Sequence, residues 1–308
     1  MKTVLPEARN AMANRIALRR AFSLVEVLVA MAILALLFGM TAAAVQRVRA
    51  AAAKAKCSNN LRQIALAAHQ YHDQGKALPQ GTELPQGSGS MPYACWQAKL
   101  LPFLERADLW RITVSAYRTD PDFLHNPPHV GLSTPVVFFS CPADARTASV
   151  PILADGIGRA LTSYQGSEGT RSSRRDGVLF LGSAVQLSDV KDGTSSTILA
   201  GERPPSPDFI FGWWYAGWGQ DKDGEGDAVL GSRTLNLRNK YPSCPLGPYA
   251  YSVGSLTNPC DTFHFWSLHS GGANFAFVDG SVRFLSYSAD SILPALATRS
   301  GNEVVEIP

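Results

Sequence analysis

The chain has 308 residues, of which 45% are hydrophobic and 17% charged, so it is neither a disordered segment nor uniformly apolar. Its 28 basic and 25 acidic residues give a formal net charge of +3, but residues 1–21 alone hold five bases and one acid. The remainder is close to neutral, which excludes an overall basic field for nucleic acid.

Residues 1–21 have the composition of a targeting leader, and a long apolar segment follows them. Residues 27–46 carry no charge, and at about 1.5 Å per residue they reach ~30 Å, the thickness of a bilayer core. A cleaved secretory signal would have a shorter apolar region and a small-residue cleavage site after it. We therefore predict a membrane-spanning segment over residues 22–46.

The apolar segment continues into a helical pattern without a proline. Residues 42–55 are rich in alanine, and apolar side chains then recur at helical spacing at Leu61, Ile64, Ala68 and Tyr71. The pattern predicts one helix from about residue 22 to about residue 73, with residues 47–75 as its amphipathic half. Gly75 and Pro79 are expected to close it.

Glu26 is an acid that an ordinary membrane anchor does not need. It stands near the start of the apolar segment, and a carboxylate in hydrocarbon costs about 2.5–3.5 kcal/mol on insertion scales. One alternative places Glu26 at the level of the headgroups, in contact with water. The other gives it a partner of opposite charge.

The string RRAFSLVEVLVAMAILALL resembles the processing signal of type IV prepilins and of the pseudopilins of type II secretion. The resemblance implies that a prepilin peptidase cuts between Ala21 and Phe22 and methylates the new amino terminus. It also implies that Glu26, then the fifth mature residue, neutralises the amine of a neighbouring subunit during filament assembly. Ala21 replaces the family's usual glycine, and a start at Met12 instead of Met1 would leave a leader of ten residues.

Residues 76–308 are predicted to form an α+β globular domain with antiparallel strands. Residues 76–93 read as a loop, and apolar residues between 96 and 110 predict one or two short helices, with Pro102 in the first turn of the second. Short apolar runs separated by turn residues then predict strands at residues 136–140, 178–181, 197–200, 209–215 and 274–278.

The clearest local prediction is a hairpin in which Asp279-Gly280 joins two alternating strands through a type I′ turn. His269 stands ten positions before Asp279, and this spacing resembles the C-terminal motif of a bacterial family of unknown function known as DUF1559, whose members carry a prepilin-type N-terminus. Further strings share the resemblance and span nearly the whole chain: CSNNLRQIALAAHQYHD, LLPFLE, FSCPAD, SYQGSEG, DVKDGTSSTILAGE, HSGGANFAFVDGSVRFLS and LATRSGNEVVE.

The motif residues His269, Asp279 and Gly280 admit a structural and a catalytic interpretation. The chain has no GxSxG elbow, no P-loop and no GxGxxG string that would accompany a catalytic role. In the structural interpretation Asp279 shapes the turn, and His269 hydrogen-bonds across the base of the hairpin. We favour it and predict that the protein is not an enzyme.

We predict no cofactor, and we consider two possible metal sites. Oxygen ligands at alternate positions, with Gly226 at the sixth, give Asp221, Asp223, Glu225 and Asp227 the first half of an EF-hand-like calcium loop, but Ser232 replaces its final glutamate. An acidic surface loop is the favoured alternative. Cys260, His264 and His269 lie close in sequence, but their spacing matches no common zinc pattern.

The cysteines are expected to lie in an oxidising compartment. Cys57 and Cys141 fall inside strings shared with the family and would join the long helix to the sheet. Cys244 and Cys260 would close a local loop, contributing ~3 kcal/mol, and Cys95 is left over. Only the number of cysteines favours these pairings.

Together these features predict a pilin-like structural subunit. Its expected partners are the prepilin peptidase, the membrane and other pilin-like subunits, with no nucleic acid. It would cross the inner membrane once, with the globular domain outside the cytoplasm, and either enter a surface filament or stay in the membrane. The alternative is a membrane-anchored binding module for polymers or carbohydrates, with the aromatic residues Trp213, Trp214, Tyr215 and Trp218 as its stacking surface. For these four aromatic residues themselves, packing in the core or in a strand is the favoured interpretation.

Overall fold

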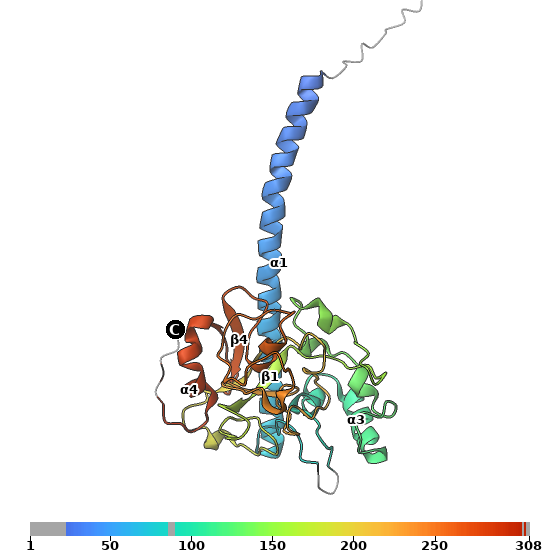
Figure 1. Cartoon of the computed structure of the whole chain (residues 1–308), viewed down its shortest axis with the longest axis vertical. Coiled ribbons are helices and arrows are strands. Elements are labelled where there is room, and N and C mark those ends of the chain that lie inside the picture. Colours follow the sequence, from blue (N-terminus) through green and yellow to red (C-terminus); the bar gives the residue numbers. More distant parts are fainter. Residues whose placement is uncertain (1–22, 86–89, 304, 306–308) are drawn as a thin grey trace, which may run out of the picture. The chain divides into compact units, whose positions relative to one another are not determined.

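The computed structural model describes residues 23–85, 90–303 and 305, and its longest helix, α1, covers Leu24–Gly75 (Figure 1). This confirms the predicted continuous helix, which ends at the glycine expected to close it. The chain divides into two compact units, residues 1–49 and 50–308.

In the N-terminal unit, α1 carries apolar side chains that nothing covers. Leu24 is 78% exposed and Phe38 is 71% exposed, and each described residue from 23 to 49 is exposed. Water does not tolerate a continuous apolar surface of this kind, whereas lipid does. Among the described residues, α1 is the one helix long and apolar enough to cross a membrane. This unit therefore fits a membrane anchor.

The unit of residues 50–308 combines the C-terminal part of α1 with short helices and strands. Its other described α-helices are α2 (Trp96–Lys99), α3 (Ala107–Thr119) and α4 (Leu293–Ala297). Its described strands are β1 (Tyr164–Gly169), β2 (Ile198–Glu202), β3 (Val229–Gly231), β4 (Gly272–Phe277) and β5 (Val282–Ser286). Its described 3₁₀ helices are η1 (Leu101–Phe103), η2 (Val130–Ser133), η3 (Val137–Phe139), η4 (Ala145–Ala148), η5 (Leu187–Asp189), η6 (Leu237–Asn239), η7 (Pro259–Phe263) and η8 (Tyr287–Ser291).

The strands form one five-stranded sheet in the order β3-β1-β2-β4-β5. The pairings β1 with β2, β2 with β4, and β4 with β5 are antiparallel, and the α+β class is confirmed. One pairing departs from the antiparallel prediction, because β3 lies parallel to β1. A long connection through β2 and its following loop separates the two strands in sequence, and only such a connection permits parallel pairing.

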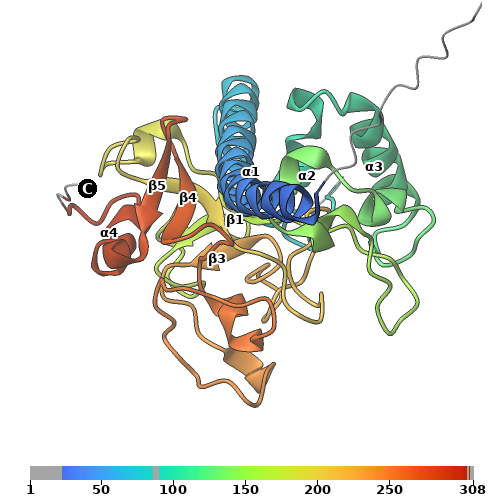
Figure 2. The same cartoon turned by 90° about the horizontal axis from the view of Figure 1, so that it is seen from above.

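The C-terminal part of α1 packs against this sheet. Cys57, Leu61 and Ile64 are fully buried in the same core as Tyr164 of β1 and Ala276 of β4. Figure 2 shows β4 and β5 on one side of this part of α1, with α2 and α3 on the other. The helix is therefore enclosed on both sides by the domain.

β4 is buried on both faces, and its side chains alternate between two cores. Ala273, Phe275 and Phe277 belong to a second core that includes Leu293 and Leu296 of α4. Ala276, on the opposite face, belongs to the core that contains the C-terminal part of α1. Asn274 lies on that same face of the strand, which places it on the side of α1.

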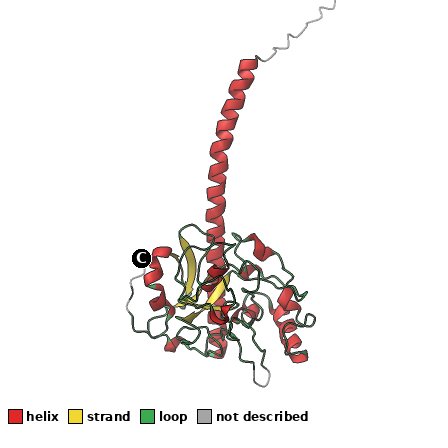
Figure 3. Cartoon of the chain, viewed as in Figure 1, coloured by secondary structure: helices red, strands yellow, loops and turns green. Residues whose placement is uncertain are grey.

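Several predicted strands are absent, and two strands were missed. Residues 197–200 and 274–278 were correctly predicted, as β2 and β4, but residues 136–140 contain the 3₁₀ helix η3. Residues 178–181 and 209–215 are loops with bends and isolated bridges. Loops make up much of the globular domain (Figure 3). β1 was missed because its sequence YQGSEG is polar, although each of its residues is buried.

The predicted helical region between residues 96 and 110 is confirmed. Pro102 lies in η1, which follows α2, and a third helix, α3, begins at Ala107. Pro102 occupies an early position of η1, where its missing N–H costs nothing.

Candidate functional site

The hairpin β4–β5 forms as predicted, but its turn is different. Gly280 has a φ of +85°, whereas Asp279 is not in the left-handed region that a type I′ turn requires. The Gly280 N–H donates to the Phe277 carbonyl at 3.0 Å, and the Phe277 N–H donates to the Ser281 carbonyl at 2.8 Å. The loop therefore has three residues and ends in a left-handed glycine. Asp279 is exposed, and its carboxylate accepts the Ser281 N–H at 2.8 Å.

His269 does not hydrogen-bond across the base of this hairpin, contrary to the structural interpretation of the motif. Its side chain is buried, and its Nε2 lies 3.2 Å from Oε1 of Glu202. The backbone before β4 holds it in place, because Ser267 Oγ accepts the His269 N–H at 3.0 Å and donates to the Gly272 carbonyl at 2.7 Å. The two halves of the motif thus have separate environments.

Glu202 is the residue at this position that sequence reasoning missed. It is the last residue of β2 and is 2% exposed. Besides His269, it is held by Asn274 of β4, whose backbone N–H donates to Oε2 at 2.6 Å and whose Nδ2 donates to Oε1 at 3.0 Å. A buried carboxylate is stable only with such donors. The sequence signal that could have identified Glu202 is a single acidic residue at the end of the otherwise uncharged strand β2.

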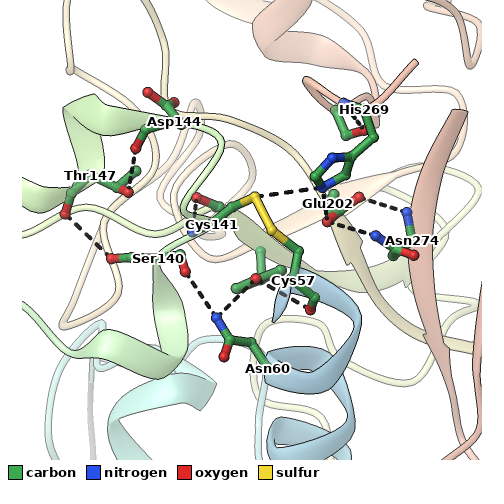
Figure 4. Close-up of a disulfide and its surroundings, with 12 residues drawn as sticks. Cys57, Asn60, Ser140, Cys141, Asp144, Thr147, Glu202, His269 and Asn274 are labelled. Carbon is green, nitrogen blue, oxygen red and sulfur yellow. Dashed lines mark hydrogen bonds and ion pairs between the residues drawn. A yellow bond between two sulfur atoms is a disulfide. The ribbon is translucent and has the colours of Figure 1, made fainter. Parts of the chain in front are cut away.

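The disulfide between Cys57 and Cys141 lies directly beside this pair (Figure 4). Nε2 of His269 is 3.6 Å from Sγ of Cys141. The structure forms both pairings that the sequence suggested, Cys57–Cys141 and Cys244–Cys260. Cys95 is free and buried, and burial raises the pKa of its thiol well above the usual value.

Four groups that can each donate one ligand atom therefore converge. The Sγ atoms of Cys57 and Cys141, one carboxylate oxygen of Glu202 and one ring nitrogen of His269 all lie within 4.8 Å of one another, and all four residues are buried. They come from α1, from the loop between η3 and η4, from β2 and from the segment before β4. We call these four residues the Cys–Glu–His cluster.

Surrounding hydrogen bonds hold the helix side of the cluster. Nδ2 of Asn60 donates to the Ser140 carbonyl at 2.9 Å, and the Tyr164 hydroxyl donates to the Cys57 carbonyl at 3.4 Å. A cavity of about 10 Å³ lies against the cluster, with a lining that includes Cys141 and Glu202. This is close to the smallest volume that holds one water molecule.

At the N-terminal end of α1, Glu26 has a local partner that the sequence analysis did not consider. The Ser23 N–H donates to Oε2 of Glu26 at 2.8 Å, and the Glu26 N–H donates to Oγ of Ser23 at 3.2 Å. This reciprocal pattern is a capping box. Within residues 23–85, 90–303 and 305, no basic side chain pairs with Glu26. Ala21 and Phe22 lie outside the described residues.

The geometry of the acidic loop does not support the calcium alternative, and the favoured interpretation as a surface loop is wrong for Glu225 and Asp227, which are 1% and 3% exposed. Asp221 pairs with Arg238, whose Nε lies 3.0 Å from Oδ1, and Asp223 accepts the Glu225 N–H at 3.0 Å. Asp227 accepts the Gly219 N–H at 2.8 Å. Among the described residues, these four acids do not bring their oxygens to one point.

The same loop contributes to a group of buried acids that the sequence analysis did not identify. Glu168 on β1 and Glu225 in this loop are both buried, and burial raises the pKa of both groups. Burial also raises the pKa of Asp227 to about 7, although Arg203 and two backbone N–H groups oppose the shift. These acids therefore retain protons in the folded protein at a pH where the unfolded chain has lost them.

The zinc set of Cys260, His264 and His269 is not formed. Cys260 is bonded to Cys244, and Nε2 of His264 lies 3.1 Å from Asp261. His269 faces Glu202 and Cys141 instead.

The proposed aromatic stacking surface is mostly interior. Trp214 and Tyr215 are fully buried and Trp213 is 7% exposed, so core packing holds for these three. Trp218 is 40% exposed, but its ring packs against Phe123 with centroids 5.3 Å apart. These residues therefore do not form a platform for sugar rings.

Two family models match the chain. Residues 46–291 match the family described as "Protein of unknown function (DUF1559)", and residues 17–42 match the prokaryotic N-terminal methylation motif. No curated protein and no solved structure matches. The first model covers the whole Cys–Glu–His cluster, and the second covers Ala21, Phe22 and Glu26.

Proposed function

Because the chain belongs to the DUF1559 family and carries the prokaryotic N-terminal methylation motif, we propose that it is a pilin-like structural subunit processed by a prepilin peptidase. Cleavage between Ala21 and Phe22 leaves a methylated amine at Phe22. The exposed apolar part of α1 anchors the product in the inner membrane, with the globular domain outside the cytoplasm. The N-terminal methylation motif supports a structural subunit rather than an enzyme.

The observation that carries this proposal is the position of Glu26. Its carboxylate is held at the N-terminal end of an apolar helix by the capping box with Ser23, close to where the new amine would form. If this capping box lies in lipid, the Glu26 carboxylate keeps a negative charge without a basic partner, which costs free energy in hydrocarbon. The amine of Phe22 on a neighbouring copy neutralises that charge, and it fixes the register between the two helices more than it adds stability.

Mass spectrometry of the mature amino terminus tests the processing step. The expected product begins with an N-methylated Phe22, and a variant with Ala21→Glu keeps its leader because the cleavage site is changed. The substitution Met12→Ala, in the leader but away from the cut, serves as the matched control and leaves cleavage intact in a chain that starts at Met1. Membrane-extracted protein that retains residues before Phe22 contradicts the proposal.

The second candidate is a membrane-anchored binding module, and one observation favours it. A hollow of about 580 Å³ is lined by three aromatic residues, Tyr71, Phe103 and Trp110, with Gln74 and Lys99 at its polar side. Aromatic faces with adjacent polar groups suit sugar rings. These residues replace the buried set around Trp214 as the candidate binding surface.

Titration of the detergent-solubilised full chain with soluble oligosaccharides, followed by tryptophan fluorescence, tests this second candidate. Trp110→Ala should remove binding, whereas Trp218→Ala, which changes an exposed indole outside the hollow, should leave it unchanged. Equal oligosaccharide affinity of Trp110→Ala and Trp218→Ala would show that the hollow is not the binding surface.

A further inference from the structure

We propose that, when the Cys57–Cys141 disulfide is reduced, the Cys–Glu–His cluster binds one Zn²⁺ ion through both thiolates, Glu202 and His269. The disulfide and the metal are then two alternative links between the C-terminal part of α1 and the rest of the domain. The inference rests on the interior of residues 50–308 and is independent of the proposed role as a pilin-like subunit.

The positions of the ligand atoms support a tetrahedral site. With zinc bonds of about 2.0–2.3 Å, ligand atoms in a tetrahedron lie about 3.3–3.8 Å apart. Nε2 of His269 already lies 3.2 Å from the Glu202 oxygen and 3.6 Å from Sγ of Cys141, and all four ligand atoms fall within 4.8 Å of one another. The two sulfur atoms, which are covalently bonded in the oxidised chain, must move apart, and any pair of ligand atoms more than about 3.8 Å apart must come closer.

The chemistry of the donor set selects the metal. Two thiolates, one imidazole and one carboxylate suit zinc, which accepts sulfur, nitrogen and oxygen ligands in tetrahedral geometry. Calcium and magnesium require oxygen ligands, and this cluster offers only one oxygen-bearing side chain. The four protein ligands fill the coordination sphere, as in structural zinc sites.

Neighbouring groups already orient two of the ligands. Asn274 holds Glu202 through two hydrogen bonds, and Ser267 fixes the backbone of His269. Such support around the ligands commonly changes metal affinity by about 10–100-fold.

The conversion of the Cys57–Cys141 disulfide into a zinc site is balanced in electrons and protons. Reduction of the disulfide adds two electrons and two protons and gives two thiols, and a phosphine reductant supplies the electrons as it becomes its oxide with oxygen from water. Zn²⁺ then displaces the two thiol protons and forms two Zn–S bonds. The metal itself keeps its oxidation state.

The test uses the full chain in detergent, either oxidised or reduced with a phosphine, dialysed against Zn²⁺ and analysed for metal content. We expect one additional zinc per chain after reduction, and Co²⁺ in its place should give thiolate charge-transfer bands and the visible bands of a tetrahedral site. His269→Ala and the near-isosteric Glu202→Gln should each weaken zinc binding at least about tenfold.

The matched control removes the other disulfide. A variant with Cys244→Ser and Cys260→Ser should bind zinc after reduction as the wild type does, because no histidine and carboxylate among the described residues join that pair in a cluster. Circular dichroism of each variant establishes that the fold is retained. Equal zinc content in oxidised and reduced wild type overturns the proposal, and so does unchanged affinity in folded Glu202→Gln.

Discussion

His269 lies 3.2 Å from Glu202, before the start of β4, whereas Asp279, the aspartate of the same sequence motif, lies in the turn after the end of β4. Both side chains are buried, whereas Asp279 is exposed and bonded to the backbone of its own turn. We therefore expect His269 and Asp279 to contribute differently to the stability of the fold.

The first prediction follows from that difference. His269→Ala leaves the buried Glu202 with one partner fewer and should lower the free energy of unfolding by at least about 3 kcal/mol. Asp279→Ala removes one exposed hydrogen bond and should cost about 1 kcal/mol or less. Urea denaturation of both variants provides the comparison, and equal losses would mean that the motif acts as one unit.

Gly280 should be sensitive for a backbone reason alone. A Cβ at this position meets only the ring of His69, at 3.7 Å or more, so there is space for it. The φ of +85° is nevertheless unfavourable for alanine, and Gly280→Ala should destabilise the domain by about 1 kcal/mol. Gly193→Ala, also with positive φ and open space, is the matched control and should cost a similar amount. A much larger loss at Gly280 would indicate a role beyond the turn.

The two disulfides should differ in what their removal costs. Cys57 and Cys141 are 84 residues apart, and Cys244 and Cys260 are 16 apart. In the chain-entropy model the longer loop corresponds to about 4–5 kcal/mol and the shorter one to about 3 kcal/mol. Thermal denaturation of the two double Cys→Ala variants in metal-free buffer should give the lower Tm for the Cys57 and Cys141 pair. The reverse order would show that residual structure or packing outweighs loop entropy.

The stability of the globular unit should decrease as the pH rises. Burial raises the pKa of Glu168, Glu225 and Asp227, that of Asp227 from 3.8 to about 7. A raised folded-state pKa gives stability that is complete below the unfolded pKa and is lost as the pH rises through the folded value. The Tm should therefore fall between about pH 4, near the unfolded-state pKa, and about pH 7, the folded-state pKa of Asp227.

Glu168→Gln tests the origin of this pH dependence, because glutamine reproduces the neutral side chain at every pH. The variant should show a flatter dependence of Tm on pH than the wild type, by calorimetry. Glu105→Gln, at an exposed glutamate, is the control and should leave the profile unchanged. An equally steep profile in Glu168→Gln would exclude the buried acids as its cause.

Glu26 should matter for assembly and not for membrane insertion. Glu26→Ala removes the carboxylate that would meet the amine of the neighbouring copy, so incorporation into a sheared filament fraction should fall more than about tenfold. The membrane fraction should still contain the protein, because the apolar side chains of α1 are unchanged. Ser23→Ala, which weakens the cap but keeps the charge, should assemble. Normal incorporation of Glu26→Ala contradicts the assembly role.

The sequence by itself determined the features that depend on neighbouring residues. The length of the apolar run predicted α1, and alternating side chains around Asp279-Gly280 predicted the β4–β5 hairpin. Prolines and glycines marked the ends of elements. Each of these follows from short-range sterics or from a local count of apolar side chains.

Only the tertiary structure decided which distant residues meet. β1 is polar in sequence and becomes a strand because its neighbours bury it, and Trp214 is interior because the domain closes over it. Glu202 reaches His269 and the Cys57–Cys141 disulfide because β2 pairs with β4 while α1 packs on the same face of the sheet. No local sequence pattern predicts contacts between residues so far apart in the chain, because such contacts depend on how the whole core packs.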